Sequence, residues 1–283
     1  MSIISVTRVS KNYKEAKVLH DINLEVNKGE IFGLLGPSGA GKTTLIKLLL
    51  GLTSKTKGEI EVLGKTPSNY NSSIYSSFGM VLDRDGFFER LSCYDNLDIF
   101  ASIYSIENKK TTLLNILKKV GLFDAKNKSV SKLSNGMRQR LSFARAILHD
   151  PQIVFLDEPT SGLDPATTLK IHSLIKEMQS KGTTFLLTTH NMDEAEKMCD
   201  RLALLNEGHI IETGSPKEIC LKNQIEHKVS IELDNGKIKV VGIDNLEQEI
   251  INISHNHHNI VRIHSKEPTL EDVFINLTGR RIE

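Results

Sequence analysis

A glycine-rich segment at residues 36–43 carries the residue types with the most specific chemistry in the chain. In order, the segment consists of Gly36, Pro37, Ser38, Gly39, Ala40, Gly41, Lys42 and Thr43, and Thr44 follows it. It fits the pattern G-x-x-x-x-G-K-[ST], in which backbone N–H groups and a helix N-terminus surround a phosphate. Lys42 can reach the β- and γ-phosphates, and the Thr43 hydroxyl can ligate Mg²⁺. The segment therefore predicts a binding site for a nucleoside triphosphate.

Two neighbouring acids, Asp157 and Glu158, end a later apolar run at residues 152–156. A carboxylate at a strand end is well placed to hold Mg²⁺, directly or through water, and this role is predicted for Asp157. Glu158 can orient or deprotonate the attacking water. The alternative is a pair of acids without a role, and it is weakened because α/β sheets bind ligands at the carboxyl ends of their strands.

Strands must alternate with helices to position these residues. The predicted strands are residues 3–9, 18–26, 31–35, 58–64, 77–82, 152–156, 183–189, 201–205 and 209–212. Helical patterns follow at residues 44–50, 95–149 and 167–181. This order predicts an α/β core with a parallel sheet, interrupted by a helical insertion. The alternative for the glycine-rich segment, an ordinary turn with an exposed lysine, is disfavoured by the strand before it and the helix after it.

The composition shifts after about residue 215. Strands are predicted at residues 229–233, 238–240 and 259–264, with a hairpin turn at 234–236 and a capped helix at 269–279. This predicts a small α+β appendage. Polar neighbours favour a solvated loop over a metal site for the histidines here, which are His255, His257, His258 and His264.

The overall composition narrows the class of protein. There are 36 basic and 35 acidic side chains, and this balance argues against a general nucleic-acid binder. Three cysteines without metal-ligand spacing fit a reducing compartment. No apolar run approaches the ~18 residues that a bilayer-spanning helix needs, and the N-terminus does not resemble a signal peptide. A cytoplasmic protein that does not cross a membrane by itself is therefore expected.

The segment at residues 133–140 can be compared with a motif of a known protein family. It contains Ser134, Asn135, Gly136 and Met137, and a helix is expected after it at residues 141–148. The segment resembles the Leu-Ser-Gly-Gly-Gln signature of the ATP-binding-cassette family, of which it keeps the serine and the second glycine. In that family the signature of one subunit caps the γ-phosphate held by the other subunit.

Three further matches follow the order of the family's motifs. The segment at residues 161–164, which ends in Asp164, resembles the loop that links the two nucleotide sites across a dimer. His190 resembles the switch histidine, which contacts the γ-phosphate and positions the attacking water. Tyr13 resembles the aromatic residue that stacks on adenine; the alternative for it is a simple surface aromatic.

Asp83 is a departure from the family's pattern. The family usually places a glutamine here, bridging the metal and the transmembrane partner, whereas a carboxylate binds Mg²⁺ more electrostatically but reaches less far. Asp83 is therefore a candidate metal ligand, and the alternative is an acid of the surface that couples to the partner. Arg84, Phe87 and Phe88 are candidates for that coupling surface, and the alternative for Phe87 and Phe88 is a place in the core.

The resemblance covers residues 1 to about 215. It implies a P-loop NTPase (RecA-like) fold of the α/β class, with an N-terminal antiparallel β subdomain and an α-helical signature subdomain. We expect an ATPase domain at residues 1–220, with its helical subdomain at about 84–150, and the appendage at residues 221–283.

The implied function is that of an ATP-binding and ATP-hydrolysing subunit of an exporter, with ATP and Mg²⁺ as cofactors. Glu158 and His190 would carry hydrolysis. The expected partners are integral membrane permease subunits and a second nucleotide-binding subunit, with the pair most simply a homodimer on the cytoplasmic face of the membrane. The tail resembles that of drug, antibiotic and lantibiotic exporters, which argues mildly against an importer. The alternative from another class is a soluble cassette ATPase that remodels a cytosolic assembly.

Overall fold

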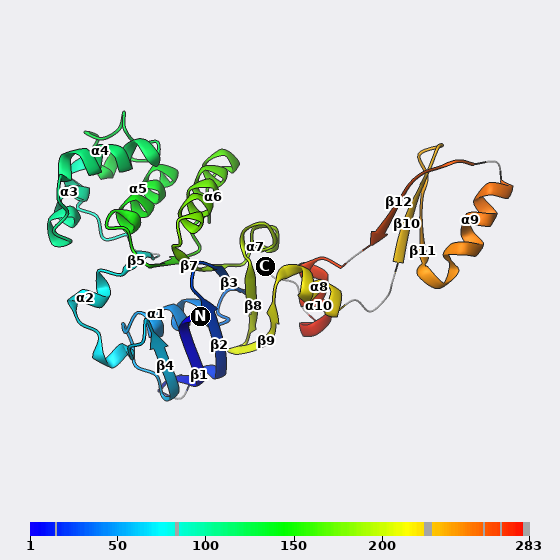
Figure 1. Ribbon diagram of the computed structural model, residues 1–283, viewed down its shortest axis with the longest axis horizontal. Helices are drawn as coiled ribbons and strands as arrows, with labels where there is room; N and C mark the ends of the chain where they lie inside the picture. The colour runs from blue at the N-terminus through cyan, green and yellow to red at the C-terminus, as the bar shows by residue number, and fades with distance from the viewer. Residues whose placement is uncertain (15, 83–84, 224–227, 257, 267, 280–283) are drawn as a thin grey trace. The chain divides into compact units, whose positions relative to one another are not determined.

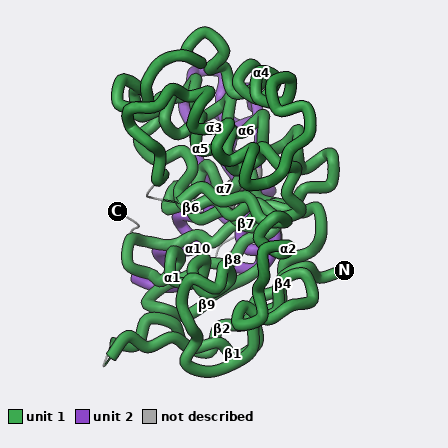
Figure 2. The backbone as a smooth tube through the Cα atoms, turned by 90° about the vertical axis from the view of Figure 1, so that its left-hand side faces the viewer, with its two compact units in different colours: residues 1–213, 283 green, residues 214–282 purple. Residues whose placement is uncertain are grey.

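The computed structural model describes residues 1–14, 16–82, 85–223, 228–256, 258–266 and 268–279. It divides into two compact units, residues 1–213 and residues 214–282, which Figure 2 distinguishes by colour. The candidate ligand Asp83, its neighbour Arg84 and the histidine His257 lie outside the described residues.

The first unit is built on a six-stranded sheet with the strand order β5-β6-β7-β3-β8-β9. Its strands are β3 (Ile31–Leu35), β5 (Phe78–Val81), β6 (Ile153–Asp157), β7 (Thr184–Thr189), β8 (Arg201–Asn206) and β9 (His209–Gly214). The pairs β5–β6, β6–β7, β7–β3 and β3–β8 are parallel. All residues of β3 and β7 are buried, as expected for strands covered on both faces.

This strand order sets the position of the chemistry. The glycine-rich segment follows β3, Asp157 ends β6, and His190 follows β7 directly. These three strands are neighbours in the sheet and run in the same direction. Their carboxyl ends therefore meet at one edge, where open α/β sheets bind ligands.

A second, antiparallel sheet has the order β2-β1-β4. It consists of β1 (Ser2–Tyr13), β2 (Ala16–Asn27) and β4 (Lys57–Val62). Helix α1 (Lys42–Leu49) contacts β2 and β4 of this sheet and β6 of the central sheet. Its apolar side chains join both sheets in one buried core.

The remaining helices of this unit lie between the strands in the chain order. They are α2 (Ser72–Tyr75), α3 (Cys93–Ile103), α4 (Lys109–Lys119), α5 (Asn135–Ile147), α6 (Pro165–Ser180) and α7 (Met192–Met198), with short 3₁₀ turns at Pro67–Asn69 and Val130–Lys132. Three of these helices, α3 to α5, lie between β5 and β6. Helices α3, α4 and α5 pack on one another, and α5 also packs on β5. The expected helical insertion thus consists of α3, α4 and α5, which lie together in Figure 1.

Helix α5 begins earlier than the sequence suggested. The expected start was residue 141, but the helix starts at Asn135. The Ser134 side chain caps it by accepting a hydrogen bond from the Met137 N–H at 3.3 Å. The expectation was wrong because the polar first turn hides the helical period, whereas a serine cap satisfies an N–H that would otherwise lack a partner.

The second unit contains a three-stranded antiparallel sheet with the order β11-β10-β12. Its elements are α8 (Pro216–Lys222), β10 (Lys228–Leu233), β11 (Ile238–Gly242), a 3₁₀ turn at Ile243–Asn245, α9 (Leu246–His255), β12 (Ile260–Lys266) and α10 (Leu270–Thr278). Ile253 of α9 packs with three buried residues of β10. The capping box of α10 forms as the sequence indicated, between Thr269 and Asp272. Helices α8 and α9 were not predicted from the sequence.

No helix among the described residues is long and apolar enough to cross a bilayer. Within the same residues, no three His, Cys, Asp or Glu side chains cluster as a metal site. The His258 ring instead lies 3.4 Å from a carboxylate oxygen of Asp234.

Candidate functional site

The glycine-rich segment forms the loop between β3 and α1. A Cβ at Gly36 would lie 2.1 Å from the carbonyl oxygen of Leu205, so only glycine fits there. Gly41 has a φ of 110°, which L-residues rarely adopt, and it is the N-cap of α1. The loop therefore enters the helix directly, so that the N-terminal N–H groups of α1 and its dipole favour an anion at the loop.

Lys42 is the first residue of α1, and only 5% of its surface is exposed. Its Nζ donates hydrogen bonds to the carbonyl oxygens of Gly36 at 2.7 Å and Pro37 at 3.1 Å. It also lies 3.3 Å from Oε1 of Glu158. The lysine thus joins the loop to the acid at the end of β6.

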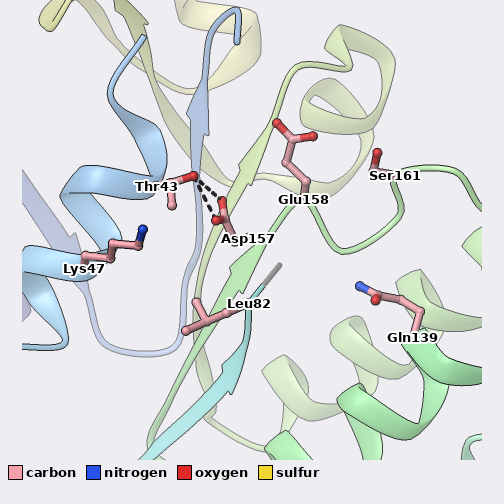
Figure 3. Close-up of a pocket in the computed structure, with 7 residues that line it drawn as sticks. All are labelled: Thr43, Lys47, Leu82, Gln139, Asp157, Glu158 and Ser161. Atoms are coloured by element: carbon pink, nitrogen blue, oxygen red, sulfur yellow. Dashed lines mark hydrogen bonds between the residues drawn. The ribbon is translucent and has the colours of Figure 1, made fainter. Parts of the chain in front are cut away.

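Two cavities lie along this edge of the sheet. The first has a volume of about 740 Å³ and is shown in Figure 3, lined by Thr43, Lys47, Leu82, Gln139, Asp157, Glu158 and Ser161. The second, of about 290 Å³, is lined by Val18, by the loop from Pro37 to Thr44 and by Glu158. Thr43 and Glu158 line both, so the loop and the two acids share one site.

Thr43 and Asp157 form the oxygen-rich part of this site. The Thr43 hydroxyl lies 2.9 Å and 3.2 Å from the two carboxylate oxygens of Asp157 (Figure 3). The Thr188 hydroxyl also donates to Asp157, at 2.6 Å, which fixes the carboxylate. A hydroxyl and a carboxylate are hard oxygen ligands of the kind that Mg²⁺ prefers.

Glu158 lies between Lys42 and His190. Its Oε2 is 3.0 Å from Nδ1 of His190, and its Oε1 faces the lysine. Its backbone N–H donates to the Thr188 hydroxyl at 3.0 Å. The φ of Glu158 is +48°, a left-handed conformation that costs a non-glycine residue about 1 kcal/mol or more.

The signature-like segment does not enter this site. None of Ser134, Asn135, Gly136 and Met137, all of them described residues, lines either cavity. A Cβ at Gly136 would lie 3.6 Å from Thr167 and 3.8 Å from Leu163, so the start of α5 adjoins the loop before α6. The four residues therefore lie apart from the cavities of their own chain.

Asp164 also has a local partner. It is the N-cap of α6, and its carboxylate accepts hydrogen bonds from the Thr167 hydroxyl at 2.6 Å and the Thr167 N–H at 3.0 Å. The side-chain bond from Thr167 holds the pKa of the Asp164 carboxyl below its ordinary value. Asp164 thus fixes the end of the loop at residues 161–164.

Tyr13 ends β1 and is 43% exposed. Lys11 Nζ lies 4.3 Å from the centre of its ring, so one ring face carries a cation. Tyr13 lines neither cavity, although Val18, which follows it on β2, lines the smaller one.

Two functional candidates carry no sequence prediction. Gln139 of α5 lines the larger cavity, and its amide donates to the carbonyl oxygen of Pro159 at 2.9 Å. Glu194 of α7 is buried and accepts hydrogen bonds from the Thr160 and Thr189 hydroxyls. The sequence contains one indication of Glu194, because Asn191 and Glu194 have the spacing of a capping box at a helix N-terminus. This spacing predicts only that Glu194 caps its own helix.

Comparisons with known proteins add to this geometry. A family model described as ABC transporter matches residues 19–161. The chain is 37% identical to a fluoroquinolones export ATP-binding protein of Mycobacterium tuberculosis, over 99% of this chain and 94% of that protein. It is 33% identical to the bacitracin transport ATP-binding protein BcrA of Enterococcus faecalis, over 98% of this chain and 96% of that protein.

Solved structures agree with these similarities. An ATP-binding subunit of an ABC transporter superposes with a TM-score of 0.73 and 25% identity, covering 88% of this chain and all of that one. A dimeric ATP-binding cassette in a post-hydrolysis state with ADP and Pi superposes with a TM-score of 0.68 and 26% identity, covering 75% of this chain and 98% of that one.

Proposed function

The chain belongs to the ABC transporter family, and from this premise we propose that it binds and hydrolyses ATP to power export through separate transmembrane subunits. The observation that carries the proposal is the convergence of three strand ends on one site. There Lys42 and His190 both lie within hydrogen-bond or ion-pair distance of Glu158, and Thr43 contacts Asp157.

In this proposal the loop at residues 36–44 holds the phosphates of ATP. The N–H groups at the start of α1 and the ammonium of Lys42 balance their negative charge. Glu158 accepts a proton from the attacking water or orients it, and His190 holds Glu158 and contacts the terminal phosphate. Tyr13 offers to the adenine the ring face opposite Lys11.

Thr43 and Asp157 would hold Mg²⁺, since their oxygens already lie within 3.2 Å of each other. When bound, Mg²⁺ neutralises charge on the phosphates. Asp83 remains a candidate for a further ligand.

Asp157→Asn tests this assignment. We expect the variant to need at least about tenfold more Mg²⁺ for half-maximal ATP hydrolysis, because an amide is a weaker ligand for a hard cation than a carboxylate. The measurement is the hydrolysis rate as Mg²⁺ is titrated at saturating ATP. Asp200→Asn, at the other end of the sheet, is the control and keeps the wild-type requirement. An unchanged requirement in Asp157→Asn would count against the assignment.

We further propose that two copies of the chain pair head to tail around two ATP molecules. Ser134 caps α5 with its hydroxyl and lies apart from the cavities of its own chain. In a head-to-tail pair, the start of α5 would face the loop of the other copy and add N–H donors to its γ-phosphate. Asp164 and its loop would then lie between the two sites.

The permease contact is assigned to the segment that leads into α3. Phe88 is 55% exposed, whereas Phe87 is buried, with Arg145 4.8 Å above its ring. Asn96 is fully buried and binds both the N–H and the carbonyl oxygen of Phe88, which fixes this residue at the surface. An exposed aromatic residue on a fixed backbone suits a protein interface.

Affinity purification from detergent-solubilised membranes tests the transporter role. We expect an integral membrane protein to co-purify with the chain, and more of it with Glu158→Gln, because slow hydrolysis retains the ATP-bound state. This outcome would also support a position on the cytoplasmic face of the membrane. Recovery of soluble partners alone, from membranes shown to be extracted, would favour the alternative, an ATPase that remodels a cytosolic assembly.

A further inference from the structure

A buried carboxylate, Glu194, lies behind the proposed catalytic pair. It belongs to the first turn of α7, and 7% of its surface is exposed. Its Oε1 accepts a hydrogen bond from the Thr160 hydroxyl at 2.6 Å and lies 2.8 Å from Nε2 of His172. Its Oε2 accepts a hydrogen bond from the Thr189 hydroxyl at 2.7 Å. One side chain therefore joins α7 to three other segments.

The helix cap explains why Glu194 is available for these contacts. Asn191 caps α7 by accepting the N–H of Glu194 at 2.9 Å. In a capping box the glutamate would return to the N–H of Asn191. Here that N–H donates to the Thr189 hydroxyl instead, at 3.0 Å. The carboxylate of Glu194 thus points into the protein rather than serving its own helix.

The segments that Glu194 joins are the ones that carry the proposed catalytic residues. Thr160 lies two residues after Glu158, and Thr189 precedes His190 directly. The carbonyl oxygen of Thr189 accepts the N–H of Gly36 at 3.3 Å, so the phosphate loop is linked to the same point.

The negative charge of Glu194 strengthens the hydrogen bonds that its carboxylate accepts. Burial alone would raise the pKa of its carboxyl, but the hydrogen bonds from His172, Thr160 and Thr189 outweigh burial and hold the pKa below its ordinary value. An ionised carboxylate accepts stronger hydrogen bonds than a neutral group. Leaving any of these groups unpaired inside the protein is unfavourable, so the arrangement resists displacement of either threonine.

We propose that Glu194 is a positioning residue for ATP hydrolysis, which holds the segments of Glu158 and His190 at a fixed separation. The inference rests on the proposed roles of those two residues. Oε1 binds Thr160, which directly precedes the loop at residues 161–164, and Oε2 binds Thr189 of β7. Movement of that loop would therefore shift β7 and His190. Glu194 thereby also links the loop assigned to the dimer contact with the hydrolytic site of the same chain.

Removal of single hydroxyls on the full-length chain tests the proposal. We expect Thr160→Val and Thr189→Val each to lower kcat by about tenfold to a hundredfold, since small displacements of catalytic groups have effects of that size. The Kd for ATP should stay within about twofold of wild type, because neither hydroxyl lines the phosphate loop. Glu194→Ala should have the largest effect, and Glu194→Gln, which keeps the length of the side chain, should recover part of the rate.

Thr184→Val is the matched control. Thr184 is fully buried on the same strand as Thr189, and its hydroxyl accepts the N–H of Gly29 at 2.9 Å at the opposite end of β7. Its loss removes an equivalent hydroxyl, so it should lower the melting temperature while kcat stays near wild type.

Two results would overturn the proposal. Wild-type kcat in both Thr160→Val and Thr189→Val would show that the link does not serve hydrolysis. An equal fall in Thr184→Val would show that any buried hydroxyl of β7 matters. Glu158→Gln, measured in parallel, separates this failure from that of the proposed function. If Glu158→Gln hydrolyses ATP at the wild-type rate, the catalytic assignment fails; if it is inactive and the threonine variants are not slowed, only the role of Glu194 fails.

Discussion

Glu158→Gln is expected to lower the rate of ATP hydrolysis by about a hundredfold to a thousandfold, because a glutamine cannot accept a proton from water. The carboxylate lies at the end of β6, with one oxygen 3.3 Å from Lys42 Nζ and the other 3.0 Å from His190 Nδ1. The amide keeps nearly the same shape, so the strained backbone at this position is unaffected. The measurement is phosphate release at saturating ATP and Mg²⁺.

Glu207→Gln provides a matched control. Glu207 also has a left-handed backbone, with a φ of +46°, and its side chain lines neither cavity. The control should hydrolyse ATP at the wild-type rate, and Glu158→Gln should still bind ATP with a Kd near wild type. A Glu158→Gln protein that binds ATP and hydrolyses it within about threefold of wild type would contradict the role of Glu158.

Lys42→Ala is expected to raise the Kd for ATP by about a hundredfold or more. The lysine is 5% exposed and is held by the carbonyl oxygens of Gly36 and Pro37, so its charge is fixed where phosphates would bind. A hydrogen bond between charged groups contributes about 1.5–3 kcal/mol, and an unpaired phosphate oxygen adds to the loss.

Equilibrium titration with a fluorescent ATP analogue measures this effect. Lys181→Ala is the control, since Lys181 is 64% exposed on its side chain and pairs with Glu177 at the surface of α6. The control should bind the analogue as wild type does. Equal affinity of Lys42→Ala and wild type would show that the lysine does not bind the phosphates.

The sequence predicts the parts of the fold where local pattern and tertiary contact agree. The run at residues 31–35 is apolar throughout, and it is buried on both faces of the central sheet. Asp157 follows another apolar run at residues 153–156, and His190 follows a strand whose centre, residues 185–187, is apolar. Both could therefore be expected at the same edge of a parallel sheet. The structure brings Lys42, Thr43 and Asp157 together at this edge, and Glu158 and His190 with them.

Other features depend on contacts that a local pattern does not contain. The start of α5 at Asn135 depends on the cap by Ser134, which a search for apolar periodicity does not detect. The spacing of Asn191 and Glu194 suggests a capping box, yet the Thr189 hydroxyl takes the N–H that would complete it. The hydrogen-bond partners of Asn191 and Glu194 depend on residues outside α7, such as Thr189 and Thr160. The role of Glu194 could therefore be assigned only from the folded structure.

The molar mass of Glu158→Gln in solution, with and without ATP and Mg²⁺, tests the central claim most directly. If two copies enclose ATP between the loop of one and Ser134 of the other, ATP should double the mass of the variant, and a second substitution, Lys42→Ala, should abolish the doubling. A protein that binds ATP at saturation and keeps the mass of a single chain would contradict the head-to-tail pair on which the proposed mechanism depends.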